Sequence, residues 1–301
     1  MKRKYSGVVI FFLLCCTALV LVIGAAKFTT RAGASGSGLE ATPATNEVDA
    51  LLSALEATVT DAMQLNECGE AEAGQLRALA REEPERARQL EFIASHVEIY
   101  SQDAVKTALL GGDHIDFALE LPFRAPDSSG LDSEISVQAG AVPYMSQYDA
   151  RWGYHAYGSS VMGITGCGPT CLTMVAAGLN GDGSINPARV ADFAMANGYY
   201  APGAGTTWSM FTDGAVHFGL SGVEIPLDEG VMHGYLDTGS VIVASMLPGD
   251  FTQSGHFIVI YGSSDGGFRV HDPNSTERSA QIWSYERLAC QIANMWAMSR
   301  A

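Results

Sequence analysis

The stretch Gly166-Cys167-Gly168-Pro169-Thr170, followed by an apolar run to Leu179, decides how the second half of this 301-residue chain is interpreted. Proline fits the first turn of a helix, where its missing N–H is not needed, so we expect a helix over residues 169–179 with Cys167 at its N-terminus. The unpaired N–H groups there favour a thiolate over a thiol, and the thiolate is the nucleophilic form. The flanking glycines would leave the sulfur open to a substrate carbonyl. A small buried cysteine near a tight turn is the simpler interpretation.

A nucleophilic cysteine needs a general base, and His256 is the candidate for that role. His256 precedes an apolar run, residues 257–261, that predicts a strand, and residues 268–271 predict the returning strand of a hairpin. Such a hairpin would place Asp272 within one residue of the position opposite His256. A carboxylate there fixes the imidazole tautomer and stabilises its charged form. The sequence therefore predicts a triad of Cys167, His256 and Asp272.

Acyl transfer also requires hydrogen-bond donors that point at the oxyanion as it forms. We expect the side chain of Gln147 to be one donor. The backbone N–H of Cys167, at the start of the helix, would be the second.

Two neighbours of Asp272 could replace members of this triad. His271 could act as the base, but side chains alternate along a strand, so His271 should point to the face opposite that of Asp272. Asn274 could take the orienting role instead of the carboxylate. We favour the set with His256 and Asp272.

Cys171 lies four residues after Cys167, so the two side chains would share one side of the helix. Cys171 could be a redox partner or a metal ligand, but packing beneath the helix is the simpler expectation. Zinc would need further His or Cys residues at ligand spacing, and the sequence offers none. We therefore expect no metal and no cofactor. Three aromatic residues could either line a substrate groove or lie in the core: Trp152, Tyr200 and Trp208.

The second half of the chain predicts an α+β domain, with helices first and strands later. Asn186-Pro187 opens a second helix that should end at Met195. Short β-like runs follow at residues 241–246, 257–261 and 268–271. Together with the helix at Cys167 this predicts a domain in which that helix packs on an antiparallel sheet.

The first half divides into several segments. Leu51, Leu55, Val59 and Met63 recur at helical spacing, as do Leu90, Ile93, Val97 and Tyr100, which predicts a small helical module. Gly, Ser, Ala and Thr dominate the stretch before it and indicate a flexible spacer. The expected domains are a signal peptide or membrane anchor (1–31), a spacer (32–46), the helical module (47–123), a linker (124–141) and the catalytic domain (142–301).

The N-terminus predicts export. Lys2, Arg3 and Lys4 precede an uncharged apolar run, residues 7–26, which is long enough as a helix to cross a membrane. The basic cluster should stay in the cytoplasm. The rest would then lie on the extracellular face, on a single-pass anchor, or be secreted after cleavage near residues 24–26.

Composition limits the class of partner. The chain has 47% hydrophobic residues and a formal net charge of −16, so it is a folded, acidic protein. That charge repels phosphate backbones, which argues against nucleic acid as a partner. Four cysteines lie outside the apolar run: Cys68, Cys167, Cys171 and Cys290. Stability should therefore come mainly from a hydrophobic core, although a bridge between Cys68 and Cys290 is possible.

The motifs occur together in an order that resembles the C39-like papain-fold cysteine peptidases of bacteria. The resemblance covers the last 160 or so residues and is carried by residues 142–147, 151–153, 157–158, 166–170, 255–257 and 272–274. It implies Cys167 as nucleophile, His256 as general base, Asp272 as orienter and Gln147 as oxyanion donor.

The resemblance implies an exported thiol hydrolase that cleaves peptide bonds through a thioester on Cys167, with a peptide or protein as substrate. Two alternatives remain open at this point. One is a cell-wall peptide amidase or transpeptidase that uses the same triad. The other is a papain-fold module that binds peptides without catalysis.

Overall fold

The computed structural model describes residues 43–128 and 130–301. The predicted signal peptide or anchor therefore lies outside the described residues. Within the described ranges, no helix is both long and apolar enough to cross a membrane. The chain divides into two compact units, Met1–Thr58 and Val59–Ala301, of which the second contains the predicted catalytic residues.

The described part of the first unit is helix α2 (Pro43–Glu56). The helical spacing of Leu51, Leu55, Val59 and Met63 predicts a helix that continues to Met63, and that prediction is wrong. Val59 lies in a separate 3₁₀ turn, η1 (Val59–Asp61), and Met63 is 72% exposed. The β-branched run Thr58-Val59-Thr60 has low helix propensity, and the Thr58 hydroxyl donates to Leu55 O at the helix end.

Short helices form the first part of the second unit, as the apolar spacing predicts. Leu90 and Ile93 are fully buried on one of them, whereas Val97 and Tyr100 are buried on the 3₁₀ turn that follows and just after it. The helical elements are α3 (Glu70–Glu82), η2 (Pro84–Arg86), α4 (Ala87–Ser95), η3 (Val97–Ile99), α5 (Gln102–Ala108), α6 (Asp113–Glu120) and η4 (Leu121–Phe123).

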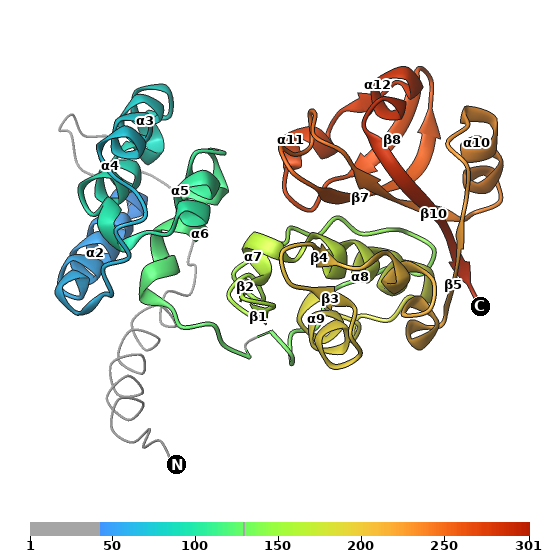
Figure 1. The fold of residues 1–301 in the computed structure, drawn as a ribbon, viewed down its shortest axis with the longest axis horizontal. Helices are drawn as coiled ribbons and strands as arrows, with labels where there is room; N and C mark the ends of the chain where they lie inside the picture. The colour runs from blue at the N-terminus through green and yellow to red at the C-terminus, as the bar shows by residue number, and fades with distance from the viewer. Residues whose placement is uncertain (1–42, 129) are drawn as a thin grey trace, which may run out of the picture. The chain divides into compact units, whose positions relative to one another are not determined.

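The rest of this unit combines helices with one six-stranded antiparallel sheet, in the order β5-β10-β6-β7-β8-β9 (Figure 1). The sheet strands are β5 (Leu220–Glu224), β6 (Val241–Met246), β7 (His256–Ser264), β8 (Gly267–His271), β9 (Ile282–Trp283) and β10 (Ile292–Arg300). Two small hairpins lie outside it, β1 (Ala156–Tyr157) with β2 (Ser160–Val161), and β3 (Tyr200–Ala201) with β4 (Gly205–Thr206). The helical elements are α7 (Met162–Thr165), α8 (Cys167–Asn180), α9 (Pro187–Ala196), η5 (Trp208–Phe211), η6 (Ala215–Phe218), α10 (Glu229–Asp237), α11 (Thr276–Ser279) and α12 (Tyr285–Ala289).

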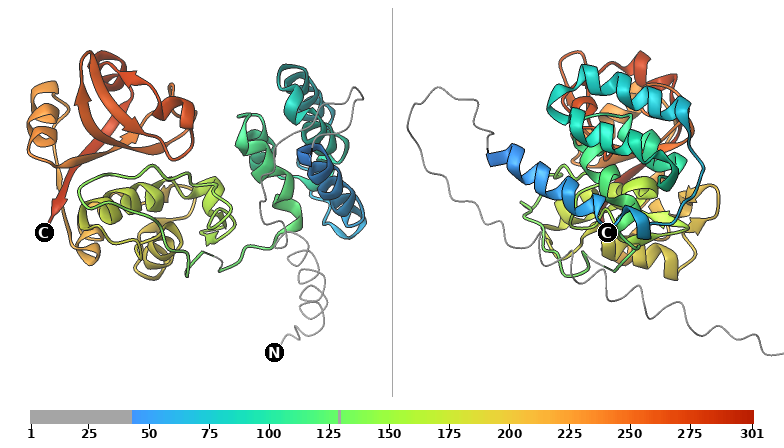
Figure 2. Two further views of the ribbon diagram at one scale, coloured as in Figure 1. Left: turned by 180° about the vertical axis from the view of Figure 1, so that it is seen from behind. Right: turned by 90° about the vertical axis from the view of Figure 1, so that its left-hand side faces the viewer.

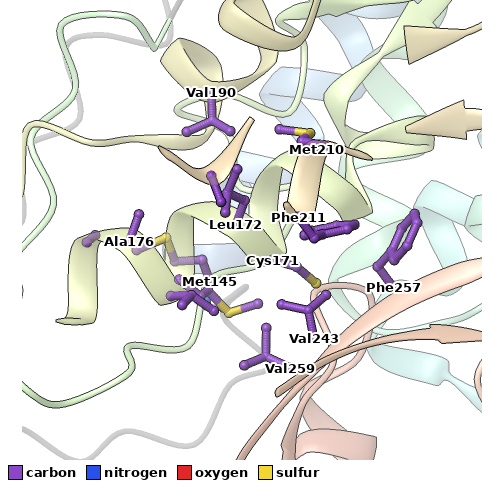
Figure 3. Packing of buried hydrophobic residues seen from close by; sticks show 14 of the residues in the cluster. Met145, Cys171, Leu172, Ala176, Val190, Met210, Phe211, Val243, Phe257 and Val259 are labelled. Atoms are coloured by element: carbon purple, nitrogen blue, oxygen red, sulfur yellow. The ribbon is translucent and has the colours of Figure 1, made fainter. Parts of the chain in front are cut away.

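The two faces of the sheet bury different cores. Helix α8 packs on one face, where Cys171 and Leu172 meet Val243, Phe257 and Val259 (Figure 3). The opposite face carries a second apolar cluster, to which α10 contributes Met232 and α12 contributes Leu288. Figure 2 shows the layer of α8 and α9 from behind. The α+β character predicted from the sequence is thus confirmed.

The sequence located three of the six sheet strands. Runs 241–246, 257–261 and 268–271 correspond to β6, β7 and β8, and the helices predicted from Pro169 and Pro187 correspond to α8 and α9. Strand β10, which lies between β5 and β6, was not predicted. It is interrupted by polar Asn294 and Ser299 and has a register shift between Ile292 and Asn294, so its apolar pattern is uneven.

Trp296 on β10 gives a test of this fold. It is 1% exposed and packs against Phe211 and Trp208. We expect Trp296→Ala to lower the free energy of unfolding by about 3–5 kcal/mol in urea titrations, because it leaves a cavity in the core. Val223→Thr, on the neighbouring strand β5 and 50% exposed, is the control and should cost under about 0.5 kcal/mol. Equal losses in the two variants would contradict the central position of β10.

Candidate active site

Cys167 is the first residue of α8, and Gly166 caps that helix. The helix begins two residues earlier than predicted, and the thiol lies at its N-terminus in a half-buried position. The flanking glycines are required by the packing around them. A Cβ on Gly168 would lie 2.3 Å from the Thr206 Oγ1, and one on Gly166 would lie 2.5 Å from Met162 O. Close packing therefore requires these glycines, whatever they contribute to substrate access.

His256 links Cys167 to Asp272. Its Nε2 lies 2.7 Å from Asp272 Oδ1, and the ring lies close enough to the Cys167 side chain for the sulfur to raise the pKa of the imidazole. The imidazole is 7% exposed. Burial lowers the pKa of His256, but the Asp272 carboxylate and the Cys167 sulfur outweigh it and raise that pKa to about 10. The ring is therefore an imidazolium at neutral pH, between sulfur and carboxylate.

The hairpin register differs from the prediction by one residue. Val259 pairs with His271, so Asp272 aligns with Ile258 and lies two residues from the position opposite His256. The tight turn between Ser264 and Gly267, and the bulge between Ile260 and Gly262, set this register. Asp272 still reaches His256, because diagonal neighbours two residues apart share one face of a sheet.

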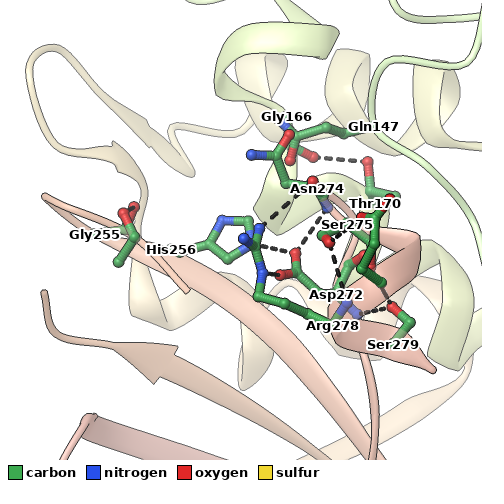
Figure 4. A network of polar contacts seen from close by, with 12 residues as sticks. Gln147, Gly166, Thr170, Gly255, His256, Asp272, Asn274, Ser275, Arg278 and Ser279 are labelled. Carbon is green, nitrogen blue, oxygen red and sulfur yellow. Dashed lines mark hydrogen bonds and ion pairs between the residues drawn. The ribbon is translucent and has the colours of Figure 1, made fainter. Parts of the chain in front are cut away.

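Arg278 is a member of the site that the sequence reading missed. Its Nε donates to Asp272 Oδ2 at 2.5 Å, while the Asn274 backbone N–H donates to Asp272 Oδ1 at 2.8 Å (Figure 4). The Asp272 side chain is fully buried. Burial alone would raise the pKa of Asp272, but His256 and Arg278 together lower it below its usual range. The sequence shows only a single arginine six residues after Asp272. A connection of that length does not fix the distance between two side chains, so the ion pair could not be predicted.

The Asp272 turn is also fixed by two serines. The Ser279 hydroxyl accepts from the Asp272 backbone N–H at 2.8 Å and donates to Ser275 O at 2.7 Å. Ser275 caps α11 by accepting from the Arg278 backbone N–H. The short helix therefore holds Arg278 at the carboxylate.

Gln147 lies beside the start of α8 and is 3% exposed. Its Nε2 donates to Gly163 O at 3.0 Å and makes a longer contact of 3.4 Å with Ile164 O, in the short helix that leads into Gly166. Its backbone N–H donates to Pro273 O at 2.8 Å, which joins this segment to the Asp272 turn. The amide nitrogen therefore already donates to the backbone beside the start of α8, while its Oε1 is buried without a hydrogen-bond partner among the described residues.

The competing candidates have other surroundings. His271 points away from Asp272, as strand alternation predicts, and its Nε2 lies 3.1 Å from Val142 O. Asn274 presents its side-chain oxygen to His114 at 3.2 Å and not to His256. Cys171 is fully buried among apolar side chains, and burial raises the pKa of its thiol well above the ordinary value. The packing interpretation of Cys171 is therefore the better one.

The remaining candidates divide between core and surface. Trp152 is fully buried, Tyr200 is half-buried against Tyr157, and Trp208 is 49% exposed. The cysteines at 68 and 290 are both free thiols, so the bridge considered between them is absent from the described structure.

Cysteine hydrolases as a class combine a thiol at a helix terminus with an imidazole and a group that orients it, and the arrangement of Cys167, His256 and Asp272 falls within that class. The chain belongs to the Peptidase_C39-like family, whose model matches residues 140–301. That match covers the whole α8-and-sheet region.

Comparison with known structures gives one further likeness. The crystal structure of the peptidase domain of Streptococcus ComA, a bifunctional ABC transporter involved in a quorum-sensing pathway, is 20% identical over 46% of this chain and 93% of that chain, with a TM-score of 0.34. No curated protein matches the chain.

The Arg278–Asp272 ion pair can be tested directly. We expect Arg278→Gln to lower the free energy of unfolding by about 3 kcal/mol, because it leaves a buried carboxylate without its cation. The loss should shrink as the pH falls, since the pKa of Asp272 will be higher without Arg278 and protonation of its carboxyl group removes the unpaired buried charge. Urea titrations at several pH values measure both effects. Arg269→Gln, an exposed position on β8, is the control; a similar loss there would show that Arg278 has no special role.

The raised pKa of His256 predicts how the free energy of unfolding changes with pH. A histidine whose folded-state pKa is raised stabilises the fold fully below its ordinary value of 6.5, and that stabilisation is lost as the pH rises towards about 10. The difference in unfolding free energy between wild type and His256→Gln should therefore shrink steadily from pH 6 to pH 10. A constant difference across that range would mean that the ring carries no extra proton in the folded state.

Proposed function

We propose that the chain is a cysteine peptidase in which Cys167 attacks a peptide carbonyl and forms a thioester acyl-enzyme. The observation that carries this proposal is the position of His256, which lies beside the Cys167 side chain and hydrogen-bonds to the buried carboxylate of Asp272. Membership of the Peptidase_C39-like family supports peptide bonds as the substrate class.

The proposed roles follow from the chemistry of each group. The Cys167 thiolate adds to the carbonyl carbon, and the His256 imidazolium then donates its proton to the leaving amine as the C–N bond breaks. The resulting neutral imidazole takes a proton from water, which attacks the thioester and releases the acid and the thiol. Asp272 holds the ring in place and stabilises its charged form, with Arg278 fixing the carboxylate.

The oxyanion would be bound at the start of α8. The Cys167 backbone N–H has no partner within the helix, and the Gln147 Nε2 lies beside it, at 3.0 Å from Gly163 O and 3.4 Å from Ile164 O. In the proposed reaction the Gln147 amide turns as a unit and exchanges the longer of these contacts for a hydrogen bond to the substrate oxygen.

We also propose that this activity lies outside the cytoplasm, with a peptide or protein as its substrate. The support is the sequence of the N-terminus, where Lys2, Arg3 and Lys4 precede an apolar run. Nucleic acid is not proposed as a partner, because the net charge of −16 repels its phosphate groups.

Labelling with an electrophilic thiol probe tests the proposed nucleophile, and the chain supplies its own reference thiol. Cys290 is exposed and its thiol contacts the Arg287 carbonyl, whereas the Cys167 thiol lies beside the His256 ring at the start of α8. At pH 6 we expect the probe to modify Cys167 at least about tenfold faster than Cys290, because a cationic imidazole and a helix N-terminus favour attack by the sulfur. His256→Ala should abolish that preference without changing the rate at Cys290.

Cleavage of a peptide library by the same variants then tests the reaction. Cys167→Ala should abolish turnover, whereas Cys290→Ala should leave it unchanged. Peptide mapping by mass spectrometry reads out both experiments. Labelling of Cys167 at the rate of Cys290, or full turnover in Cys167→Ala, would overturn the proposed function.

A further inference from the structure

His114 joins the helical module to the turn that carries Asp272. It lies in the first turn of α6 and is 5% exposed. Its Nδ1 is 3.1 Å from Gly111 O, and its Nε2 is 3.0 Å from Asn274 O, a residue 160 positions later in the chain. The ring also packs on Tyr148, with 4.1 Å between the ring centroids. The site described above uses none of these contacts.

Both ring nitrogens of His114 face groups that can only accept a hydrogen bond. Gly111 O and Asn274 O are backbone carbonyl oxygens, and a neutral imidazole has a single N–H to offer. The nearby Asn274 side chain does not change this count, because the backbone oxygen stays 3.0 Å from Nε2 whichever way the amide is turned. The two oxygens also accept from the His114 backbone N–H at 3.3 Å and from Arg278 Nη2 at 3.5 Å, respectively, but only the imidazolium, with an N–H on each nitrogen, can donate to both of them from the ring.

The charged and titratable groups around His114 come from four directions, and most are acidic. They are Asp113 on the same helix, Glu83, which accepts from the Gly112 N–H, Glu277 and Arg278 on α11, and Tyr148 beneath the ring. The Ser275 hydroxyl contributes most to lowering the pKa of Glu277, and His114 lies close enough to add to that effect. Three carboxyl groups, one guanidinium and one phenol therefore surround the ring.

The His114 contacts lead directly to two segments of the active centre. Asn274, whose carbonyl accepts from the ring, donates its own N–H to Asp272 Oδ1 at 2.8 Å. Tyr148 follows Gln147, and the Gln147 N–H donates to Pro273 O at 2.8 Å. The imidazole therefore touches both the turn with the orienting carboxylate and the segment with the expected oxyanion donor.

We propose that His114 is a positioning residue of the active centre: as a doubly protonated ring it fixes the turn of residues 272–274 against the helical module. The module is then a working part of the peptidase, and does more than space or present the catalytic domain. The kinetic consequence rests on the proposed function, whereas the protonation state of the ring does not.

The protonation state is measured without reference to activity. Long-range ¹H–¹⁵N correlation spectra of histidine rings distinguish an imidazolium from either neutral tautomer. We expect the His114 ring of the full-length wild-type protein to show both nitrogens protonated at pH 7, with its signals assigned by their loss in His114→Gln. A neutral His114 ring at pH 7, in either tautomer, would overturn the proposal.

Positioning is measured by amide hydrogen exchange and by kinetics. In His114→Gln we expect the amides of Gln147 and Asn274 to exchange about tenfold faster, and kcat to fall about tenfold with KM unchanged, as the loss of a hydrogen bond from a charged donor allows. His217→Gln is the matched control, because His217 is exposed and stacks on Phe193 and Phe218, away from Asn274 and Gln147 in the sequence and on a different element.

The outcomes separate the two proposals. Unchanged exchange at Gln147 and Asn274 in folded His114→Gln would overturn the positioning role, whether or not the protein has peptidase activity. A wild-type protein without activity but with a doubly protonated His114 and faster exchange in the variant would overturn the proposed function alone. If His114→Gln fails to fold, raising the pH of wild type until the His114 ring is neutral supplies the same exchange comparison.

Discussion

The fully buried carboxylate of Asp272 is the constraint on which the rest of the site depends. An ionised carboxylate in the interior is costly unless donors surround it. Three groups do so here, the imidazole of His256, the guanidinium of Arg278 and the backbone N–H of Asn274. Each donor comes from a different element: His256 from strand β7, Arg278 from helix α11 and Asn274 from the turn between β8 and α11. The ionised carboxylate is therefore fully stabilised only when all three elements are in place.

A second constraint acts on the thiol. Helix α8 is buried along most of its length, and its apolar side chains meet the same strands that carry the histidine. The packing of α8 therefore sets the distance between Cys167 and His256, and it leaves the sulfur half-buried at the one end of the helix that carries partial positive charge. The close fit of Gly168 against Thr206 fixes that end further.

Much of this arrangement could be predicted from the sequence, because it depends on local signals. Pro169 after Cys167, Asn186 before Pro187, and the β-branched runs of β6 and β7 are each decided within a few residues. The pairing of His256 with Asp272 was reached through the turn residues between two strands. The register was predicted one residue away from its observed value, since a bulge inside β7 leaves no local signal.

The features that could not be predicted all depend on long-range contacts. Arg278 and His114 are ordinary surface residue types in the sequence, and only the folded chain brings them to Asp272 and Asn274. Strand β10 was missed because its burial comes from two neighbouring strands and not from an even apolar pattern. In the sequence the helical module is likewise a separate segment, because no local pattern indicates that His114 contacts Asn274.

The most direct measurement of the central claim is mass spectrometry of the acid-quenched protein during cleavage of a peptide ester. The account predicts an adduct with the mass of the acyl part of the substrate, located on Cys167 by peptide mapping and removed by hydroxylamine, as expected of a thioester. Turnover of the same ester with no adduct on Cys167, or with the adduct on another residue, would contradict it.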